Sequence, residues 1–135
     1  RIVHALPAVR WTLVQDLCLD QTQLTLEGLR FLLDSLPKTE SSPPSPSSLT
    51  ELDLSRNHLG PKGVQLLANC LLAPSQKIQT LILSSCGIDR SCVRILSDCL
   101  LQNSTVQHIT VSHNYFGHRG TAPWITLLNT HHSIT

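Results

Sequence analysis

The sequence predicts an α/β solenoid, in which short parallel strands form a curved sheet on the concave side and helices cover the convex side. Three observations lead to this prediction. One spacing of apolar residues recurs four times along the chain. Each recurrence opens with alternating apolar residues, as a strand does, and closes with helical spacing. One strand–helix unit cannot bury its own apolar side, so consecutive units must stack.

The repeated unit is defined by apolar residues 3, 5, 10, 18 and 22 positions after its first apolar residue, which we number +0. Units begin near Val14, Leu49, Ile78 and Val106, at spacings of 35, 29 and 28 residues. All 24 of these positions are apolar, whereas a chain that is 41% hydrophobic would give about 10 by composition alone. The repeat is therefore real, and we expect residues 1–135 to form a single repeat domain.

Each unit divides into a strand and a helix. The L-x-x-L-x-L opening predicts a short strand with one buried face. Positions +13 to +22 carry the spacing of an amphipathic helix. The apolar residues that define the first two helices are Leu29, Leu32, Leu33 and Leu36, then Val64, Leu67 and Leu71. Neighbouring strands lie ~4.8 Å apart and packed helices ~8–10 Å apart, so the stack must curve with its strands inside.

Polar residues and glycines at the ends of these elements fit the same assignment. Thr25 and Asp89 stand in N-cap positions, and Pro61 suits a first helical turn. Asn57 and Asn114 both fall at +8, where an amide can satisfy backbone groups that neither strand nor helix pairs. Glycine occupies +14 in three of the four units, which allows close packing where the helix begins.

The segments LTELDLSRNHLGPKGVQLLANCL (49–71) and IQTLILSSCGIDRSCVRILSDCL (78–100) resemble leucine-rich repeats of the ribonuclease-inhibitor type, as found in NOD-like receptor proteins. That type alternates Asn and Cys at +8, as Asn57, Cys86 and Asn114 do here. The resemblance covers roughly residues 14–134. Three departures stand out: Thr22 at +8 of the first unit, Cys92 in place of glycine at +14, and the spacing of 35 residues between the first two units.

The surplus length in the first unit is a Pro/Ser-rich segment at 37–48, which holds four of the eight prolines. Such a composition predicts an exposed loop. Three interpretations stay open. The loop is a tolerated insertion, a target of a proline-directed kinase at Ser42-Pro43 and Ser45-Pro46, or a P-x-x-P ligand for an SH3-type partner.

Both ends of the chain fit further units of the same solenoid. Ile134 falls at +28 from Val106, the first position of another unit, while Ile2, Val3 and Leu6 read as the end of a preceding helix. The chain also contains no methionine. We therefore expect a segment of a longer protein, whose exposed repeat ends can self-associate.

Motif content predicts neither an enzyme nor a metal or cofactor site. The sequence has no Gly-rich phosphate loop after a strand, no G-x-S-x-G and no H-E-x-x-H. Its five cysteines lack paired spacing and indicate reduced thiols, of which we expect Cys70, Cys86 and Cys99 to be buried and Cys18 to be accessible. The seven histidines lack the spacing of a zinc site, so we interpret them as solvated surface residues.

Residues at +2, +4, +6 and +7 should point out of the strands and form the concave face. Acidic residues gather there in the first two units, and one apolar side chain lies near the centre. The residues that we expect to contact a partner are Asp16, Cys18, Asp20, Glu51, Asp53, Arg56, Ile82 and His108. This face is either a docking site for a basic segment of another protein, with Ile82 as an apolar anchor, or a solvated acidic surface.

These features favour a protein–protein interaction module within a larger intracellular scaffold or sensor protein. The resemblance implies ligand sensing or autoinhibition if the parent is a NOD-like receptor, and enclosure of a target protein if it resembles ribonuclease inhibitor. A subunit of a nucleic-acid-associated assembly is a further alternative, although the ten Lys and Arg residues are scattered. A net charge of +1 and short apolar runs indicate neither nucleic acid nor membrane as a direct partner. We expect a cytoplasmic location, with the nucleus as the alternative.

Overall fold

Four strands of three residues each form one parallel sheet in the computed structural model, which describes residues 16–36, 49–73 and 76–130. The strands are β1 (Asp16–Cys18), β2 (Glu51–Asp53), β3 (Thr80–Ile82) and β4 (His108–Thr110), and they pair in that order. The pairing joins equivalent positions of successive units, so that Leu52 stands opposite Leu17 on one side and Leu81 on the other. The predicted strand positions and their phase are confirmed.

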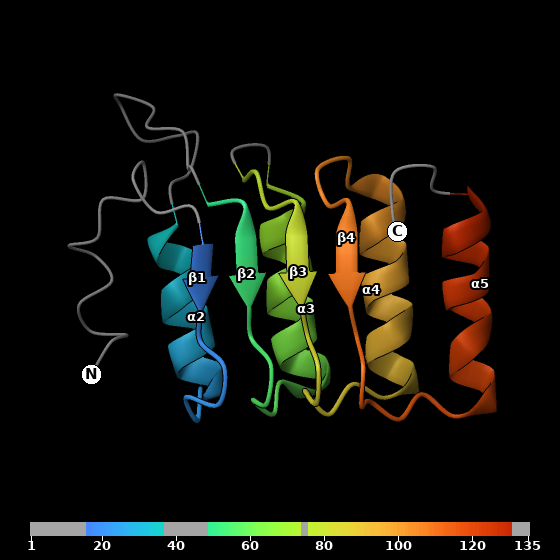
Figure 1. The fold of residues 1–135 in the computed structure, drawn as a ribbon, viewed down its shortest axis with the longest axis horizontal. Coiled ribbons are helices and arrows are strands. Elements are labelled where there is room, and N and C mark those ends of the chain that lie inside the picture. Colours follow the sequence, from blue (N-terminus) through green and yellow to red (C-terminus); the bar gives the residue numbers. More distant parts are fainter. Residues whose placement is uncertain (1–15, 37–48, 74–75, 131–135) are drawn as a thin grey trace.

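The helices all lie on one side of this sheet (Figure 1). They are α2 (Leu26–Ser35), α3 (Gly60–Leu71), α4 (Arg90–Gln102) and α5 (Thr121–Thr130), with the 3-10 turn η2 (His118–Gly120) before the last. Each α-helix contacts the next one along the chain. Figure 1 shows the helices set further apart than the strands, as expected for a stack that curves with its strands on the concave side. The predicted solenoid is confirmed.

Two of the helices begin at the predicted caps. The Thr25 hydroxyl oxygen accepts a hydrogen bond from the Gly28 amide at 3.0 Å, and the Asp89 carboxylate accepts one from the Cys92 amide at 3.0 Å. These bonds satisfy backbone donors that the first helical turn leaves unpaired. The bond from the Cys92 amide also lowers the pKa of Asp89. Helix α3 has no side-chain cap and instead carries Pro61 in its first turn.

The glycines at +14 permit the close approach that their position predicts. A Cβ atom placed on Gly120 would lie 2.7 Å from Cβ of Phe116, and one on Gly63 would lie 3.1 Å from Cβ of Leu59. In both units the +10 side chain therefore packs directly on the backbone of the first helical turn. The third unit holds Cys92 there, and its side chain is fully buried.

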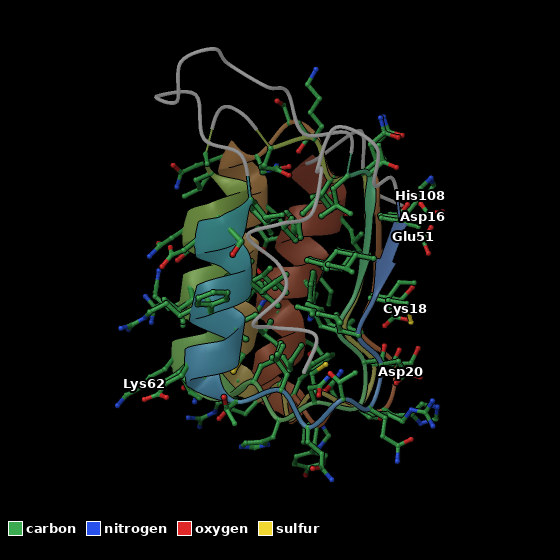
Figure 2. All side chains as sticks on the ribbon, turned by 90° about the vertical axis from the view of Figure 1, so that its left-hand side faces the viewer. Asp16, Cys18, Asp20, Glu51, Lys62 and His108 are labelled. Carbon is green, nitrogen blue, oxygen red and sulfur yellow. The ribbon has the colours of Figure 1, made fainter. Side chains whose placement is uncertain are left out.

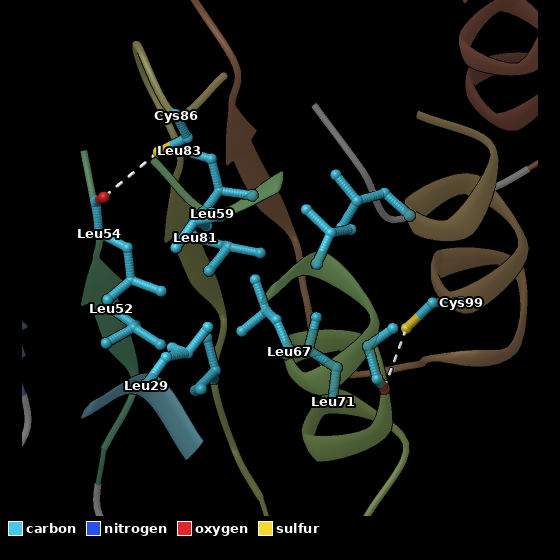
Figure 3. Close-up of a cluster of buried hydrophobic side chains, with 14 of the residues drawn as sticks. Leu29, Leu52, Leu54, Leu59, Leu67, Leu71, Leu81, Leu83, Cys86 and Cys99 are labelled. Carbon is cyan, nitrogen blue, oxygen red and sulfur yellow. Dashed lines mark hydrogen bonds between the residues drawn. The ribbon is translucent and has the colours of Figure 1, made fainter. Parts of the chain in front are cut away.

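The core lies between the sheet and the helices and is built from the repeated apolar positions (Figure 3). It is best sealed in the second and third units, where equivalent side chains from strand and helix are 0–1% exposed. These residues are Leu49, Leu52, Leu54, Leu67, Leu71, Ile78, Leu81, Leu83, Leu96 and Leu100. The first and fourth units are less complete, because Leu17, Ile109, Val111 and Trp124 are only partly buried.

The fourth helix departs from the predicted burial pattern. Leu128 occupies +22, which is buried in the other three units, yet it is 55% exposed. Ile125 at +19 is 58% exposed, whereas the equivalent Ala68 and Ser97 are buried. In the first three units the following unit covers both positions, and no described residue covers them in the fourth. The prediction that every +22 side chain lies inside is therefore wrong for Leu128, and Leu127 is the buried leucine of α5.

Candidate protein-interaction site

The turn that follows each strand is held by the side chain at +8. The Asn57 amide nitrogen donates to the carbonyl oxygens of Leu19 (2.8 Å), Leu54 (3.1 Å) and Ser55 (3.1 Å), and its carbonyl oxygen accepts from the Leu24 amide at 2.9 Å. Two of these partners belong to the preceding unit. Asn57 therefore satisfies its own turn and locks that turn to the previous one, which confirms the role expected from its phase.

The other +8 residues continue this series of hydrogen bonds, which we call the +8 ladder, with different side-chain chemistry. Asn114 repeats the pattern by donating to the Leu83 carbonyl at 2.8 Å and accepting from the amides of Cys86 and Ile88. The Cys86 thiol donates to the Leu54 carbonyl at 3.2 Å, as the dashed line in Figure 3 marks. Thr22 donates only within its own turn, to the Leu19 carbonyl at 2.9 Å. Although Thr22 departs from the Asn/Cys pattern at +8, its side chain still makes the hydrogen bond within its own turn.

The residue at +7 adopts a left-handed backbone conformation in all four units. Gln21, Arg56, Ser85 and His113 have φ between 53° and 57°. Such angles are uncommon for residues other than glycine. Because they recur at every turn, they belong to the turn geometry of the repeat and not to one specialised site.

The strands present the +2 and +4 side chains on the outer side of the sheet, away from the helices. The +2 column aligns Asp16 with Glu51, then Thr80, then His108. Figure 2 shows Asp16, Cys18, Asp20, Glu51 and His108 on this side, opposite Lys62 on the helical side. The structure thus brings the predicted site residues onto one face.

Three carboxylates form the negative part of this face, which we call the acidic wall: Asp16, Glu51 and Asp53. Asp16 is exposed, and the other two are half-exposed on the neighbouring strand. Asp16 stands directly opposite Glu51 in the parallel register. Paired strands lie ~4.8 Å apart, so the two like charges repel unless a cation approaches them. The acidic wall is therefore a surface that favours a positively charged partner.

Asp53 is held in place by two neighbours. One carboxylate oxygen accepts from the Ser55 amide at 2.9 Å, and the other accepts a weak hydrogen bond from the Cys18 thiol at 3.7 Å. The Ser55 hydroxyl in turn accepts from the Ser84 amide at 3.2 Å. A carboxylate anchored in this way loses less side-chain entropy when a partner binds it.

Asp20 and Arg56, which are predicted as separate contact residues, form an ion pair across the first two units. The Arg56 guanidinium makes two hydrogen bonds to the Asp20 carboxylate, one of them from Nε at 2.8 Å. The bond from Arg56 lowers the pKa of Asp20, and the same contact raises the pKa of Arg56. The two charges offset each other, so Asp20 adds little to the negative potential of the acidic wall.

The third and fourth units leave the face neutral. Ile82 lies between Asp53 and Thr110 in the +4 column and is half-buried, so part of its apolar surface is available. His108 is exposed at the end of the +2 column, opposite Thr80. The face therefore changes from acidic at β1 and β2 to neutral at β3 and β4.

Two buried polar residues behind this face have no repeated sequence signal. Gln76 donates to the Leu71 carbonyl (3.1 Å) and to the Thr105 hydroxyl (2.7 Å), and Asn103 donates to the same Leu71 carbonyl at 2.7 Å. Both satisfy backbone groups where a helix returns to the next strand. They stand at different phases of their units, +27 and +25, so column analysis could not identify them.

The cysteines divide into buried and accessible groups. Burial raises the pKa of Cys86, Cys92 and Cys99 to about 11 in each case. Cys18 is exposed, as predicted. Cys70 is only half-buried, so the prediction that it is buried is wrong. Helix α3 covers Cys99, whose thiol donates to the Ala68 carbonyl at 3.5 Å.

The rate of alkylation should distinguish the accessible cysteine from the buried ones. In the folded protein at pH 8, iodoacetamide should modify Cys18 first and leave Cys86, Cys92 and Cys99 unmodified. A pKa of about 11 keeps the last three almost entirely as thiols at that pH, and only the thiolate reacts. Peptide mass spectrometry over a time course measures the order. Modification of the buried thiols as fast as Cys18 would contradict the described packing.

Within residues 16–36, 49–73 and 76–130, no cluster of three or more His, Cys, Asp or Glu side chains is arranged to hold a metal ion. No helix in the same part of the chain is long and apolar enough to cross a membrane. The predicted features at Ser42, Ser45, Ile134 and the two C-terminal histidines lie outside the described residues.

Comparison with known proteins agrees with the geometry of the repeat. Residues 45–68 match the family model described as Leucine Rich repeat. The chain is 34% identical over 101 residues to human NACHT, LRR and PYD domains-containing protein 5, and 31% identical over 107 residues to pig ribonuclease inhibitor. It is 38% identical over 97 residues to rat NACHT, LRR and PYD domains-containing protein 3.

These alignments take in most of this chain and a small part of each relative. They cover 75%, 79% and 72% of the chain, which spans 8%, 22% and 9% of the three relatives. Among solved structures, the leiomodin-1 actin-binding site 2 superposes with a TM-score of 0.75 at 15% identity, covering 98% of this chain and 73% of that one. That likeness shows the fold alone. The chain belongs to the leucine-rich-repeat family, with repeats of the ribonuclease-inhibitor type that NACHT, LRR and PYD proteins also carry.

Proposed function

We propose that this chain is a protein-interaction module that binds its partner on the strand-lined concave face. The observation that carries the proposal is the acidic wall of Asp16, Glu51 and Asp53. These carboxylates are gathered on two adjacent strands, and Asp53 is fixed by hydrogen bonds. Like charges in neighbouring register cost stability unless something else offsets them, and a bound cationic partner provides that compensation.

The chemistry of the face specifies the partner. A segment that carries Lys or Arg fits the acidic wall, and an apolar side chain beside it can contact Ile82 on β3. Opposite charges of this kind accelerate association and make it sensitive to salt. The Asp20–Arg56 pair borders the acidic wall and contributes hydrogen-bonding groups with little net charge.

Reversing two charges of the acidic wall should weaken partner binding without unfolding the protein. In Glu51→Lys/Asp53→Lys, the side chains at both positions still point away from the core. We expect the affinity for the concave-face partner to fall by roughly 10- to 100-fold at low salt, since each exposed charge pair contributes only modestly. Capture from cell lysate, followed by affinity measurement on the recovered protein, tests this expectation.

The matched control reverses two carboxylates on the helical side. Glu27→Lys/Asp98→Lys makes the same change in net charge at exposed positions of α2 and α4. The control should retain the partner that the first variant loses. The same partner set recovered with both variants would refute binding through the concave face.

We further propose that the module works inside a larger scaffold or sensor protein. The relatives support this, since the matched repeats occupy a small part of each of them. In a NOD-like receptor such a module would sense a ligand or restrain a neighbouring domain, and in a scaffold it would hold a partner permanently. Binding that depends on the nucleotide state of the parent protein would identify the receptor role, and unconditional binding the scaffold role.

A second interaction is expected at the exposed end of the solenoid. Ile125 and Leu128 are open on α5, at positions that a following unit covers elsewhere. We propose that a second copy covers them in a solution of this chain, by the same packing that joins successive units. Ile125→Lys/Leu128→Lys should shift sedimentation toward monomer, and Leu101→Lys, at another exposed leucine, should not. A wild type that stays monomeric across a concentration series would contradict this expectation.

A further inference from the structure

Four cationic side chains lie on the helical side of the molecule, near the start of α3, α4 and α5. Lys62 and Arg119 occupy the same repeat position, +13, in the second and fourth units. Arg90 and Arg94 stand at +12 and +16 of the unit between them. We call this set the basic ridge. Lys62 marks its side of the molecule in Figure 2, opposite the acidic wall.

The fold places these four residues on three neighbouring elements, α3, α4 and η2. Helix α4 contacts α3 on one side and η2 on the other. A Cβ atom placed on Gly120 would lie 3.6 Å from Cα of Arg90, so the backbone next to Arg119 packs against the start of α4. Arg90 and Arg94 are one helical turn apart and share a face. Since packed helices are ~8–10 Å apart, the basic ridge extends over roughly 16–20 Å.

No acidic side chain in the described part of the chain forms an ion pair with the basic ridge. All four cations are exposed, and none of them forms an ion pair with another described residue. The adjacent carboxylate of Asp89 accepts from the Cys92 amide as the cap of α4 and forms no ion pair with the ridge. Asp98 lies one turn beyond Arg94 and makes no ion pair with it. The N-termini of α3 and α4 add partial positive charge at the same edge.

We propose that the basic ridge is a second protein-binding surface, and that it takes an acidic peptide segment. An extended segment advances ~3.4 Å per residue, so about six residues span the ridge. An acidic peptide fits better than nucleic acid. The protein has a net charge of only +1, and the acidic wall on the opposite face weakens the long-range field that a polyanion requires. The surface is separate from the concave face and selects a partner of opposite charge.

The test uses a fluorescently labelled hexaglutamate peptide and anisotropy measurements with the full chain at low salt. Arg90→Glu/Arg94→Glu should weaken binding at least roughly tenfold, because two attractions become repulsions. Helix α4 should tolerate this variant, since a carboxylate near a helix N-terminus is favourable. Arg30→Glu is the matched control, because Arg30 is exposed on α2 at +16, the repeat position of Arg94.

Hexaglutamate binding that falls with salt, is lost in Arg90→Glu/Arg94→Glu and is kept in Arg30→Glu would support the proposal. Retention of the peptide by Glu51→Lys/Asp53→Lys would show that the ridge acts independently of the concave face. No binding to the wild type, or equal weakening by Arg30→Glu, would overturn it. Tighter binding of a six-nucleotide oligothymidylate than of hexaglutamate would also overturn it, because the surface would then favour nucleic acid.

Discussion

Replacing Leu52 with aspartate is expected to unfold the chain. Leu52 is 1% exposed at the centre of the sheet, between Leu17 and Leu81. The substitution removes about 2 kcal/mol of apolar burial. It also places a carboxylate where no cation can pair with it, which costs several kcal/mol more. Small domains are stable by only about 5–15 kcal/mol. Circular dichroism should show loss of the cooperative thermal transition.

The same substitution at an exposed leucine is the control. Leu26 is 39% exposed and is the first residue of α2. An aspartate there interacts favourably with the helix N-terminus, so Leu26→Asp should change the melting temperature little. A folded Leu52→Asp variant would show that the sheet does not bury its +3 side chains as described.

Asn57→Ala is expected to destabilise the chain by about 2–6 kcal/mol, because it leaves one buried backbone amide without a partner, at about 1–3 kcal/mol, and removes three further hydrogen bonds, at about 0.5–1.5 kcal/mol each. The orphaned donor is the Leu24 amide of the first unit, whereas the Leu19 carbonyl keeps its hydrogen bond from the Thr22 hydroxyl. The free energy of unfolding, obtained from urea titration, measures the effect. The loss should begin in the first unit, where amide hydrogen exchange should accelerate most.

Two other asparagines serve as comparisons for this loss of stability. Asn114→Ala should cost less, because Asn114 is only half-buried and water can reach part of its turn. Asn69→Ala should cost a few tenths of a kcal/mol, since Asn69 makes one exposed side-chain hydrogen bond within α3, to Gln65. Equal effects at all three positions would mean that the +8 ladder does not hold the turns.

The middle of the fold could be predicted from the sequence because its contacts repeat. Leu52, Leu81 and Leu96 each pack against the units before and after their own. One spacing rule therefore describes their burial. That symmetry ends at α5, where Leu128 has the predicted spacing and lacks the neighbour that would bury it. The rule describes a position in a stack, and no described unit stacks on the last one.

Pairs within the candidate site were less predictable. Asp20 and Arg56 are 36 residues apart, at neighbouring phases of adjacent units. Arg56 lies in the left-handed turn at +7 of its unit, and its guanidinium bonds to Asp20 in the preceding unit. Composition and spacing showed that charges gather at this edge, but only the side-chain contacts show which of them neutralise each other. Gln76 and Asn103 stand at different positions of their units. No repeated sequence pattern therefore identified them.

Photo-crosslinking from Cys18 would show whether a partner binds on the concave face. This thiol is exposed at the edge of the acidic wall, beside Asp53. A benzophenone maleimide on Cys18, in a Cys70→Ala background, should crosslink the partner that Glu51→Lys/Asp53→Lys loses. The control variant carries Asn69→Cys and Cys18→Ser. It therefore holds the same label on the outer side of α3. We expect a crosslink from Cys18 and none from position 69. A crosslink from position 69 alone would contradict it.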